Sequence, residues 1–334
     1  MTDNKFLVVG LGSMGKRRVR NLKSLGYKNI TGYDVREDRR KEAAENYEIN
    51  TIDNLDGFNF NDTLAMFVSV SPDIHIQYAE MARKNNIHCF IEASVVCDGL
   101  NNLADEIEKT DLKFYASCTM RFHPAIMKIK EFVQNGKLGK VSNFSYHSGQ
   151  YLPDWHPWED IRDFYVSKRD TGGCREIVPF ELAWINDVFG EVDGISGING
   201  KTINLGVDID DVYAIAIRYK SDVIGALLVD VVSRTAIRQI VINGDKGQLC
   251  WNWNDDEIKV YSADSGEWES HKFSKGKASD GYNVNISEEM YIDEVRAFLD
   301  SIYNNKPVCN SIRDDIYTLS CLYSAENSQH ERVN

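Results

Sequence analysis

A glycine pattern directly after the first apolar run constrains this chain more than any other feature. Residues 6–9 are apolar, and Gly10, Gly12 and Gly15 follow them in the spacing G-x-G-x-x-G. A helix is predicted next and then a second strand, which ends in Asp34. A strand, a glycine turn, a helix and an acidic residue about twenty positions on form the dinucleotide-binding fingerprint of a βαβ unit. The first part of the chain is therefore predicted to bind a dinucleotide.

Each residue of the glycine turn has a predicted physical role. Gly10 makes the tight turn, Gly12 lets backbone N–H groups approach a pyrophosphate, and Gly15 lets the helix pack closely on its strand. Ser13 and Met14 lie where that helix begins, and a helix N-terminus carries the partial positive charge that phosphates favour. These five residues are the predicted pyrophosphate site.

Asp34 bears on which dinucleotide is bound. Its carboxylate can accept hydrogen bonds from both ribose hydroxyls and would repel a 2′-phosphate, so NAD is favoured over NADP. Arg36 and Arg39 leave NADP open, because guanidinium groups just past the second strand can hold a 2′-phosphate or stack on adenine. We include Asp34 and Arg36 among the predicted cofactor-binding residues.

Charge and cysteine usage exclude several classes of partner. The net charge of -13 would repel nucleic acid and anionic membrane surfaces on average. No apolar run approaches the length of a membrane span, and the start of the chain shows no signal-peptide pattern. The seven cysteines form no C-x-x-C pair and no metal-ligand spacing, which suits a reducing compartment. We therefore expect a cytoplasmic protein with no nucleic-acid, membrane or metal partner.

The pattern of predicted elements changes near residue 119. Before it, strands alternate with helices, as in a doubly wound parallel sheet; after it, β-rich runs follow one another, as in an open, mostly antiparallel sheet. We predict an α/β fold with an NAD(P)-binding Rossmann domain over 1–119 and an α+β domain for substrate binding and oligomerisation over 120–334, whose closing helices return to the first domain. The predicted strands are 5–9, 30–33, 64–70, 88–91, 112–116, 141–151, 192–204, 209–219, 223–232, 236–243, 247–253 and 257–262. The predicted helices are 16–25, 38–46, 74–86, 100–109, 174–189, 287–304 and 313–328, and residues 265–285 are predicted to form an exposed loop.

Further motifs follow the glycine turn in a fixed order. Ser71-Pro72 with His75 is similar to a strand-end T-P-x-x-x-H, Glu92 stands where an E-K-P motif begins, and Arg121 opens an R-F-x-P motif. Together with the glycine turn, this order resembles the Gfo/Idh/MocA family of glucose-fructose oxidoreductase and inositol dehydrogenase, over essentially the full length. The resemblance implies a dehydrogenase or reductase of sugars, cyclitols or nucleotide sugars. It also implies that these five residues take part in cofactor binding.

Two departures from the family pattern affect its catalytic groups. The lysine of E-K-P is replaced by Ala93. In the helix after Gly173, relatives carry an aspartate and, four residues later, the histidine that acts as general base. If the helix is aligned with the family by its end at Phe189-Gly190, those positions fall on Glu176 and Phe180. A shift of one residue instead puts Glu181 at the histidine position. Either proton transfer has moved to other side chains, or hydride chemistry has been lost.

The loop over 150–160 offers replacement groups. It contains Tyr151, His156, two tryptophans and several carboxylates, a mixture that suits stacking on sugar rings and hydrogen bonding to hydroxyls. Packing at a domain interface is the alternative. Its Y-L-P-x-W run is similar to a subgroup associated with bacterial surface-sugar biosynthesis. The predicted catalytic residues are Glu176, Glu181, Tyr151 and His156.

Three functional hypotheses remain open at this stage. The first is an NAD(P)-dependent oxidoreductase that acts on a sugar or nucleotide-sugar hydroxyl with atypical acid and base residues. The second is a non-catalytic NAD-binding sensor or assembly protein on the same fold. The third couples transient oxidation to elimination or hydrolysis, as some relatives do. The resemblance also implies a homodimer or homotetramer, because relatives bury one face of the open sheet against a second subunit.

Overall fold

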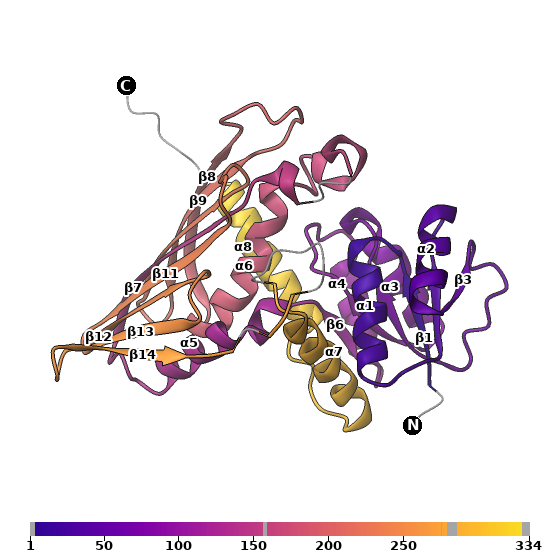
Figure 1. Cartoon of the computed structure of the whole chain (residues 1–334), viewed down its shortest axis with the longest axis horizontal. Helices are drawn as coiled ribbons and strands as arrows, with labels where there is room; N and C mark the ends of the chain where they lie inside the picture. Colours follow the sequence, from indigo (N-terminus) through magenta and orange to yellow (C-terminus); the bar gives the residue numbers. More distant parts are fainter. Residues whose placement is uncertain (1–3, 156–158, 275, 279–285, 329–334) are drawn as a thin grey trace. The chain divides into compact units, whose positions relative to one another are not determined.

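The computed structural model divides into two compact units (Figure 1). The first comprises residues 1–119 and 288–316, and the second comprises 120–287 and 317–334. The break near residue 119 coincides with the change of pattern in the sequence, while residues 288–316 group with the first unit. Within these units the structure describes residues 4–155, 159–274, 276–278 and 286–328.

The first unit contains a six-stranded parallel sheet in the order β3-β2-β1-β4-β5-β6. The predicted doubly wound parallel sheet is therefore confirmed. The chain moves outward from β1 to β2 on one side and to β4 on the other, so the topological switch point lies at the carboxyl end of β1, where ligands bind in open α/β sheets. The short edge strand β3 was not predicted. The strands are β1 (Lys5–Val9), β2 (Ile30–Tyr33), β3 (Asn50–Ile52), β4 (Thr63–Val68), β5 (His88–Ile91) and β6 (Phe114–Ala116).

One helix packs on this sheet against a row of aromatic side chains. Phe67, Phe90 and Tyr115 come from adjacent strands, and consecutive rings stack at centroid distances of 5.2 and 5.1 Å. Phe298 meets all three edge-on at 5.6 to 5.8 Å, which fastens its helix to the sheet. The helices of this unit are α1 (Ser13–Ser24), α2 (Glu37–Tyr47), α3 (His75–Lys84), α4 (Leu100–Ile107) and α7 (Glu288–Tyr303).

The second unit is built on an eight-stranded sheet in the order β14-β13-β12-β11-β7-β10-β9-β8. Neighbouring strands are antiparallel except β7 and β10, so the predicted mostly antiparallel sheet is confirmed. The prediction of a loop over 265–285 was wrong in part, because residues 267–272 form edge strand β14. Its side chains are mostly exposed, so it shows no apolar alternation. The strands are β7 (Val141–Gly149), β8 (Val192–Gly200), β9 (Val212–Tyr219), β10 (Ile224–Asp230), β11 (Ile237–Gly244), β12 (Gly247–Asn252), β13 (Glu257–Ser262) and β14 (Glu267–Lys272).

Helix α6 (Cys174–Phe189) covers one face of this sheet beside β9 and β10, as Figure 1 shows. Helix α5 (Pro124–Gln134) packs on α6, and helix α8 (Ile312–Glu326) begins in the first unit and ends in the second. In the described part of the chain, no helix is both long and apolar enough to cross a membrane.

The two edges of the eight-stranded sheet are protected differently. At the β8 edge, Gly197 exchanges hydrogen bonds through both its N–H and its carbonyl with the hydroxyl of Ser328, and the Val192 N–H donates to the hydroxyl of Tyr317. At the β14 edge, the exposed side chains include Glu267 and Glu269. Capped or charged edges discourage pairing with a further strand.

Candidate functional site

The glycine turn after β1 has one position that the fold leaves open. Gly10 has φ +88°, and a Cβ there would lie 2.5 Å from the Ser69 carbonyl oxygen. A Cβ at Gly15 would lie 1.7 Å from the Gly10 carbonyl oxygen, so both glycines are required by the fold itself. At Gly12 the nearest atom to a Cβ would be Nη1 of Arg39 at 3.4 Å. The protein therefore keeps space where the fingerprint requires backbone approach to a pyrophosphate.

The start of helix α1 suits an anion beside this turn. Gly12 is its N-cap and offers no side chain, and the first turn carries no acidic residue. Ser13 and Met14 lie in that turn, where the helix dipole favours negative charge. The start of α1 therefore fits the phosphates of a dinucleotide.

Asp34 is fixed at the end of β2 by backbone donors. Its Oδ2 accepts the N–H of Leu11 at 2.7 Å, and its Oδ1 accepts the N–H of Arg36 at 2.9 Å. The side chain of Arg36 turns instead to Asp38, 2.6 Å away, whereas Nη1 of Arg39 lies 3.9 Å from Asp34 Oδ2. Of the two arginines that kept NADP open, Arg39 is therefore the one beside the carboxylate.

Contacts between its own residues hold the segment after β4 in shape. His75 is buried, and its Nε2 is 3.0 Å from the carbonyl oxygen of Val70. Burial lowers the pKa of His75, so the imidazole is neutral near pH 7. Ser71 contacts Asp73 through its hydroxyl, and Pro72 begins a short 3-10 helix. This geometry holds the segment in shape, and the cofactor contacts of Ser71, Pro72 and His75 stay predictions.

Glu92 is held by an arginine that sequence reasoning missed. Nε and Nη2 of Arg18 each donate to one oxygen of Glu92 at 2.7 Å, and Nη1 donates to Glu294 at 3.0 Å. Arg18 is fully buried; burial opposes its charge, but the two carboxylates outweigh this and raise its pKa. The signal was present in the sequence, because Arg18 shares the buried stripe of α1 with Gly15 and Leu22.

Glu294 completes this group. Its two oxygens also accept hydrogen bonds from the hydroxyls of Ser117 and Thr119 at 3.0 and 2.8 Å and from the N–H of Cys118 at 2.6 Å. We call Arg18, Glu92 and Glu294 the Arg18 network. It ties α1, the end of β5 and α7 together around one buried guanidinium and two carboxylates.

Helix α6 of the second unit holds a carboxylate in a different state. The hydroxyl of Tyr165 donates to Oε1 of Glu176 at 2.6 Å. Oε2 is shielded from solvent and has no hydrogen-bond partner among the described residues. Burial raises the pKa of Glu176 to about 7, against the opposing effect of Tyr165. A carboxyl group with this pKa can accept or donate a proton near neutral pH.

Glu181 lies further along the same helix and is saturated with donors. It is fully buried and accepts hydrogen bonds from Tyr146, Ser148, Trp184 and Arg238 at 2.7 to 2.9 Å. The side chain thus fastens α6 to β7 and β11. Of the two glutamates predicted on α6, Glu176 is the one left with acceptor capacity.

The remaining predicted residues of the second unit are engaged as follows. The guanidinium of Arg234 lies over the ring of Tyr151, 3.7 Å from its centroid. Nε of Arg121 donates to the Ala183 carbonyl of α6 at 3.0 Å. His156 lies outside the described residues. The structure therefore brings Arg121 to α6, and leaves Tyr151 and His156 as predictions.

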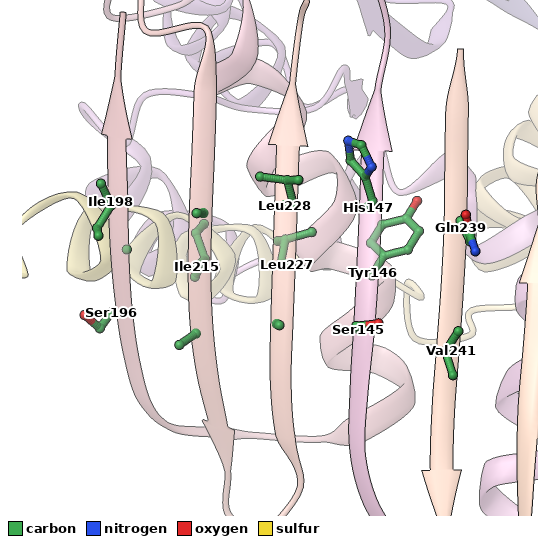
Figure 2. Close-up of a pocket in the computed structure, with 14 residues that line it drawn as sticks. Ser145, Tyr146, His147, Ser196, Ile198, Ile215, Leu227, Leu228, Gln239 and Val241 are labelled. Carbon is green, nitrogen blue, oxygen red and sulfur yellow. The ribbon is translucent and has the colours of Figure 1, made fainter. Parts of the chain in front are cut away.

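A hollow of about 570 Å³ lies on the face of the eight-stranded sheet away from the Glu176 site. Figure 2 shows it spread across neighbouring strands, with Ile198, Leu228, His147 and Val241 among its lining residues. The described residues contain no group of three or more His, Cys, Asp or Glu side chains that could hold a metal ion.

Comparisons with known proteins agree with this architecture. The family model "Oxidoreductase family, NAD-binding Rossmann fold" matches residues 4–115, and the model "GFO/IDH/MocA C-terminal domain" matches residues 126–250. A myo-inositol 2-dehydrogenase of Thermotoga maritima is 25% identical over 97% of this chain and 96% of its own length.

Solved structures share the fold at lower identity. An oxidoreductase from Agrobacterium radiobacter, in complex with NAD+, L-tartaric acid and magnesium, superposes with a TM-score of 0.84 at 14% identity, over 97% of this chain and 96% of its own. A levoglucosan dehydrogenase in complex with NADH and levoglucosan has a TM-score of 0.83 at 16% identity, over 97% and 96%.

Proposed function

Since this chain belongs to the GFO/IDH/MocA family of NAD-binding oxidoreductases, we propose that it oxidises or reduces a hydroxyl carbon of a sugar or nucleotide sugar. One observation carries the proposal beyond the family: Glu176 keeps a shielded oxygen with no hydrogen-bond partner among the described residues, and burial raises its pKa to about 7. Perturbed, incompletely bonded carboxyls of this kind are typical of functional sites. The sugar-acting relatives support the substrate class.

The residues of each unit have separate tasks in this reaction. Bound NAD would supply the hydride acceptor for the hydroxyl carbon in oxidation, and bound NADH would supply the hydride donor in reduction. Gly12 and the start of α1 hold the pyrophosphate, and Asp34 binds the adenosine ribose. In oxidation, the ionised Glu176 accepts the hydroxyl proton, and in reduction the protonated form donates it. Tyr165 stabilises the ionised form by donating to Oε1.

This assignment explains how the chain manages without two family residues. Ala93 has no charge to offer in place of the lysine, and Phe180 cannot act as a base if it stands at the histidine position. Glu181, the alternative for that position, already accepts hydrogen bonds from four donors. Glu176, one helical turn before Phe180, takes over proton transfer. A non-catalytic NAD-binding sensor is the second candidate, and the loss of both family residues favours it.

A single-turnover experiment separates the two candidates. The protein is loaded with NAD, or with NADH, a panel of sugars and nucleotide sugars is added, and absorbance at 340 nm is followed. The enzyme predicts a change within one turnover for at least one compound, with the sign set by the starting cofactor. A compound that binds tightly to the loaded protein with no absorbance change in either direction would leave the sensor as the correct function.

We further propose that the protein forms a homodimer or homotetramer through the open face of its eight-stranded sheet. Small and apolar side chains face outward there, among them Ala214, Ala216, Ala226 and the exposed Ile198 and Leu228. A second copy would cover this face, which is otherwise an aggregation hazard. Light scattering at micromolar concentration should show a dimer or tetramer, and a monodisperse monomer would contradict it.

A cytoplasmic location is also part of the proposal. All seven cysteines are present as thiols, as expected for a protein kept in a reducing compartment. Fractionation of cells that express the full chain would test this location, and recovery in a secreted fraction would contradict it.

A further inference from the structure

Two cysteine side chains of the first unit lie next to each other. The sulfurs of Cys118 and Cys309 are 3.7 Å apart, although 191 positions separate them in the sequence. The hydroxyl of Tyr115 is hydrogen-bonded to both, at 3.4 Å and 2.8 Å. Cys118 is buried and Cys309 is exposed. The proposed reaction makes no use of this pair.

The backbone holds both cysteines in place. Cys118 lies two residues after β6, and its N–H donates to Glu294 at 2.6 Å. Beside Cys309, the Asn310 carbonyl accepts the N–H of Ala116 at 3.1 Å, and Asn310 Nδ2 donates to the Ala116 carbonyl at 3.0 Å. Because these segments are anchored side by side, side-chain rotation together with a small shift of Cys118 toward Cys309 closes the sulfurs from 3.7 Å to a disulfide length of about 2.05 Å.

We propose that Cys118 and Cys309 form a reversible intramolecular disulfide when the protein meets hydrogen peroxide, and that this bond weakens NAD binding.

The chemistry proceeds in two steps. The exposed Cys309, as thiolate, attacks a peroxide oxygen; the O–O bond breaks, hydroxide leaves, and a sulfenic acid forms. Cys118, as thiolate, then attacks that sulfur; the S–O bond breaks, a second hydroxide leaves, and the disulfide forms. The two protons of the thiols convert the hydroxides to water, so two thiols are oxidised and one peroxide is reduced to two waters.

Tyr115 assists the pair as a hydrogen-bond donor. Burial is the main cause that raises the pKa of the Tyr115 phenol well above its usual value, so the hydroxyl stays protonated. It can therefore donate a hydrogen bond to whichever sulfur carries negative charge.

Formation of the disulfide affects the predicted cofactor residue Glu92 through the Arg18 network. Drawing Cys118 toward Cys309 strains its N–H bond to Glu294, which in turn holds Arg18, and Arg18 holds both oxygens of Glu92. This second step rests on the predicted role of Glu92 in cofactor binding. The formation of the disulfide does not depend on it.

Peptide mapping tests the bond. The full-length protein is treated with a small excess of hydrogen peroxide, alkylated and digested with trypsin without reduction. We expect peptide 114–121 to be linked to peptide 297–313, with two of the seven thiols lost and both restored by dithiothreitol. A different cross-link, a bond between two chains, or irreversible oxidation of Cys309 alone would overturn the proposal.

Titration with NAD before and after oxidation tests the consequence. We expect at least threefold weaker binding after oxidation and full recovery on reduction. C309S should bind NAD as the reduced wild type does and be insensitive to peroxide, whereas the matched control C250S should stay sensitive. A disulfide with unchanged NAD affinity would overturn the link to the Arg18 network. Failure of the reduced protein to bind NAD would instead contradict the proposed function, and the peptide map would still decide the disulfide.

Discussion

The carboxylates of the Arg18 network in the first unit and Glu176 in the second differ in how completely they are satisfied. In the first unit, Glu92 and Glu294 share the guanidinium of Arg18, and Glu294 accepts three further hydrogen bonds. In the second unit, Glu176 has one donor, from Tyr165, and a shielded oxygen without a described partner. Satisfied networks hold a structure in place, whereas an unsatisfied buried acceptor costs stability and is kept where it serves a reaction. The contrast indicates where to look for proton transfer.

Breaking the Arg18 network should have the largest effect. Arg18→Met leaves two carboxylates without their cation, and we expect a loss of about 3–5 kcal/mol in the free energy of unfolding, the usual result of removing one partner of a buried ion pair. Urea denaturation measures it. The control Lys16→Met removes the more exposed pair with Glu42 and should change stability by less than about 1 kcal/mol. Equal, small effects would mean that the network is not structural.

Glu176→Gln tests the chemical side of the comparison. Turnover should fall about 100-fold, the size expected for a lost general acid or base, while NAD affinity stays within about twofold. The control Glu191→Gln changes an exposed glutamate just beyond α6, which pairs with Lys220, and should leave turnover unchanged. Wild-type turnover in Glu176→Gln would remove this residue from the mechanism.

The pH dependence of folding stability should also reveal the unsatisfied state of Glu176. Because the folded pKa of Glu176 is about 7 and the ordinary value is 4.5, the folded state binds this proton more tightly than the unfolded state. Stability from this group is full below the ordinary value and is lost as pH rises toward and past 7. Glu176→Gln lacks this ionisable group. Its free energy of unfolding, relative to that of the wild type, should therefore rise by about 2 kcal/mol from pH 5 to pH 8. Thermal unfolding at both pH values measures this, and parallel curves for the two proteins would contradict it.

The same carboxyl should also set the pH profile of the reaction. Oxidation requires the ionised form, so kcat/KM should rise with pH through about 7 and then level off. The residual activity of Glu176→Gln should lack this step.

Cofactor choice is the smallest expected effect. Asp34 is fixed by two backbone N–H groups, and we expect NAD to bind about tenfold more tightly than NADP, or about 1.4 kcal/mol. Asp34→Asn should reduce this preference, because the amide does not repel a 2′-phosphate. Calorimetry with both cofactors decides it, and tighter binding of NADP to the wild type would assign the site to Arg39 instead.

Helices and strands were predictable where apolar residues recur at a regular spacing and glycines mark the ends of the element. Helix α6 begins and ends at the predicted residues, because Gly173 and Gly190 bracket an apolar-periodic run. Edge strands β3 and β14 were missed, because a short or exposed strand shows no alternation of apolar and polar residues in its sequence.

Site partners were less predictable than elements. Arg18 and Glu92 lie 74 positions apart, and Tyr165 reaches Glu176 from a short 3-10 helix, so no local spacing connects them. The sequence did indicate Glu176 and Glu181 as alternatives. The proposed preference for Glu176 rests on the donors from β7 and β11 that surround Glu181, and these come from distant parts of the sequence.

The two protected edges of the eight-stranded sheet limit the symmetry that an assembly can have. Strand-to-strand addition at an edge can repeat without end and yields filaments, but Ser328 occupies the β8 edge and β14 exposes charged side chains, among them Glu267 and Glu269. A flat face, in contrast, is used up by one two-fold contact. If the proposed dimer or tetramer forms through this face, we therefore expect a closed particle of fixed subunit number rather than a filament.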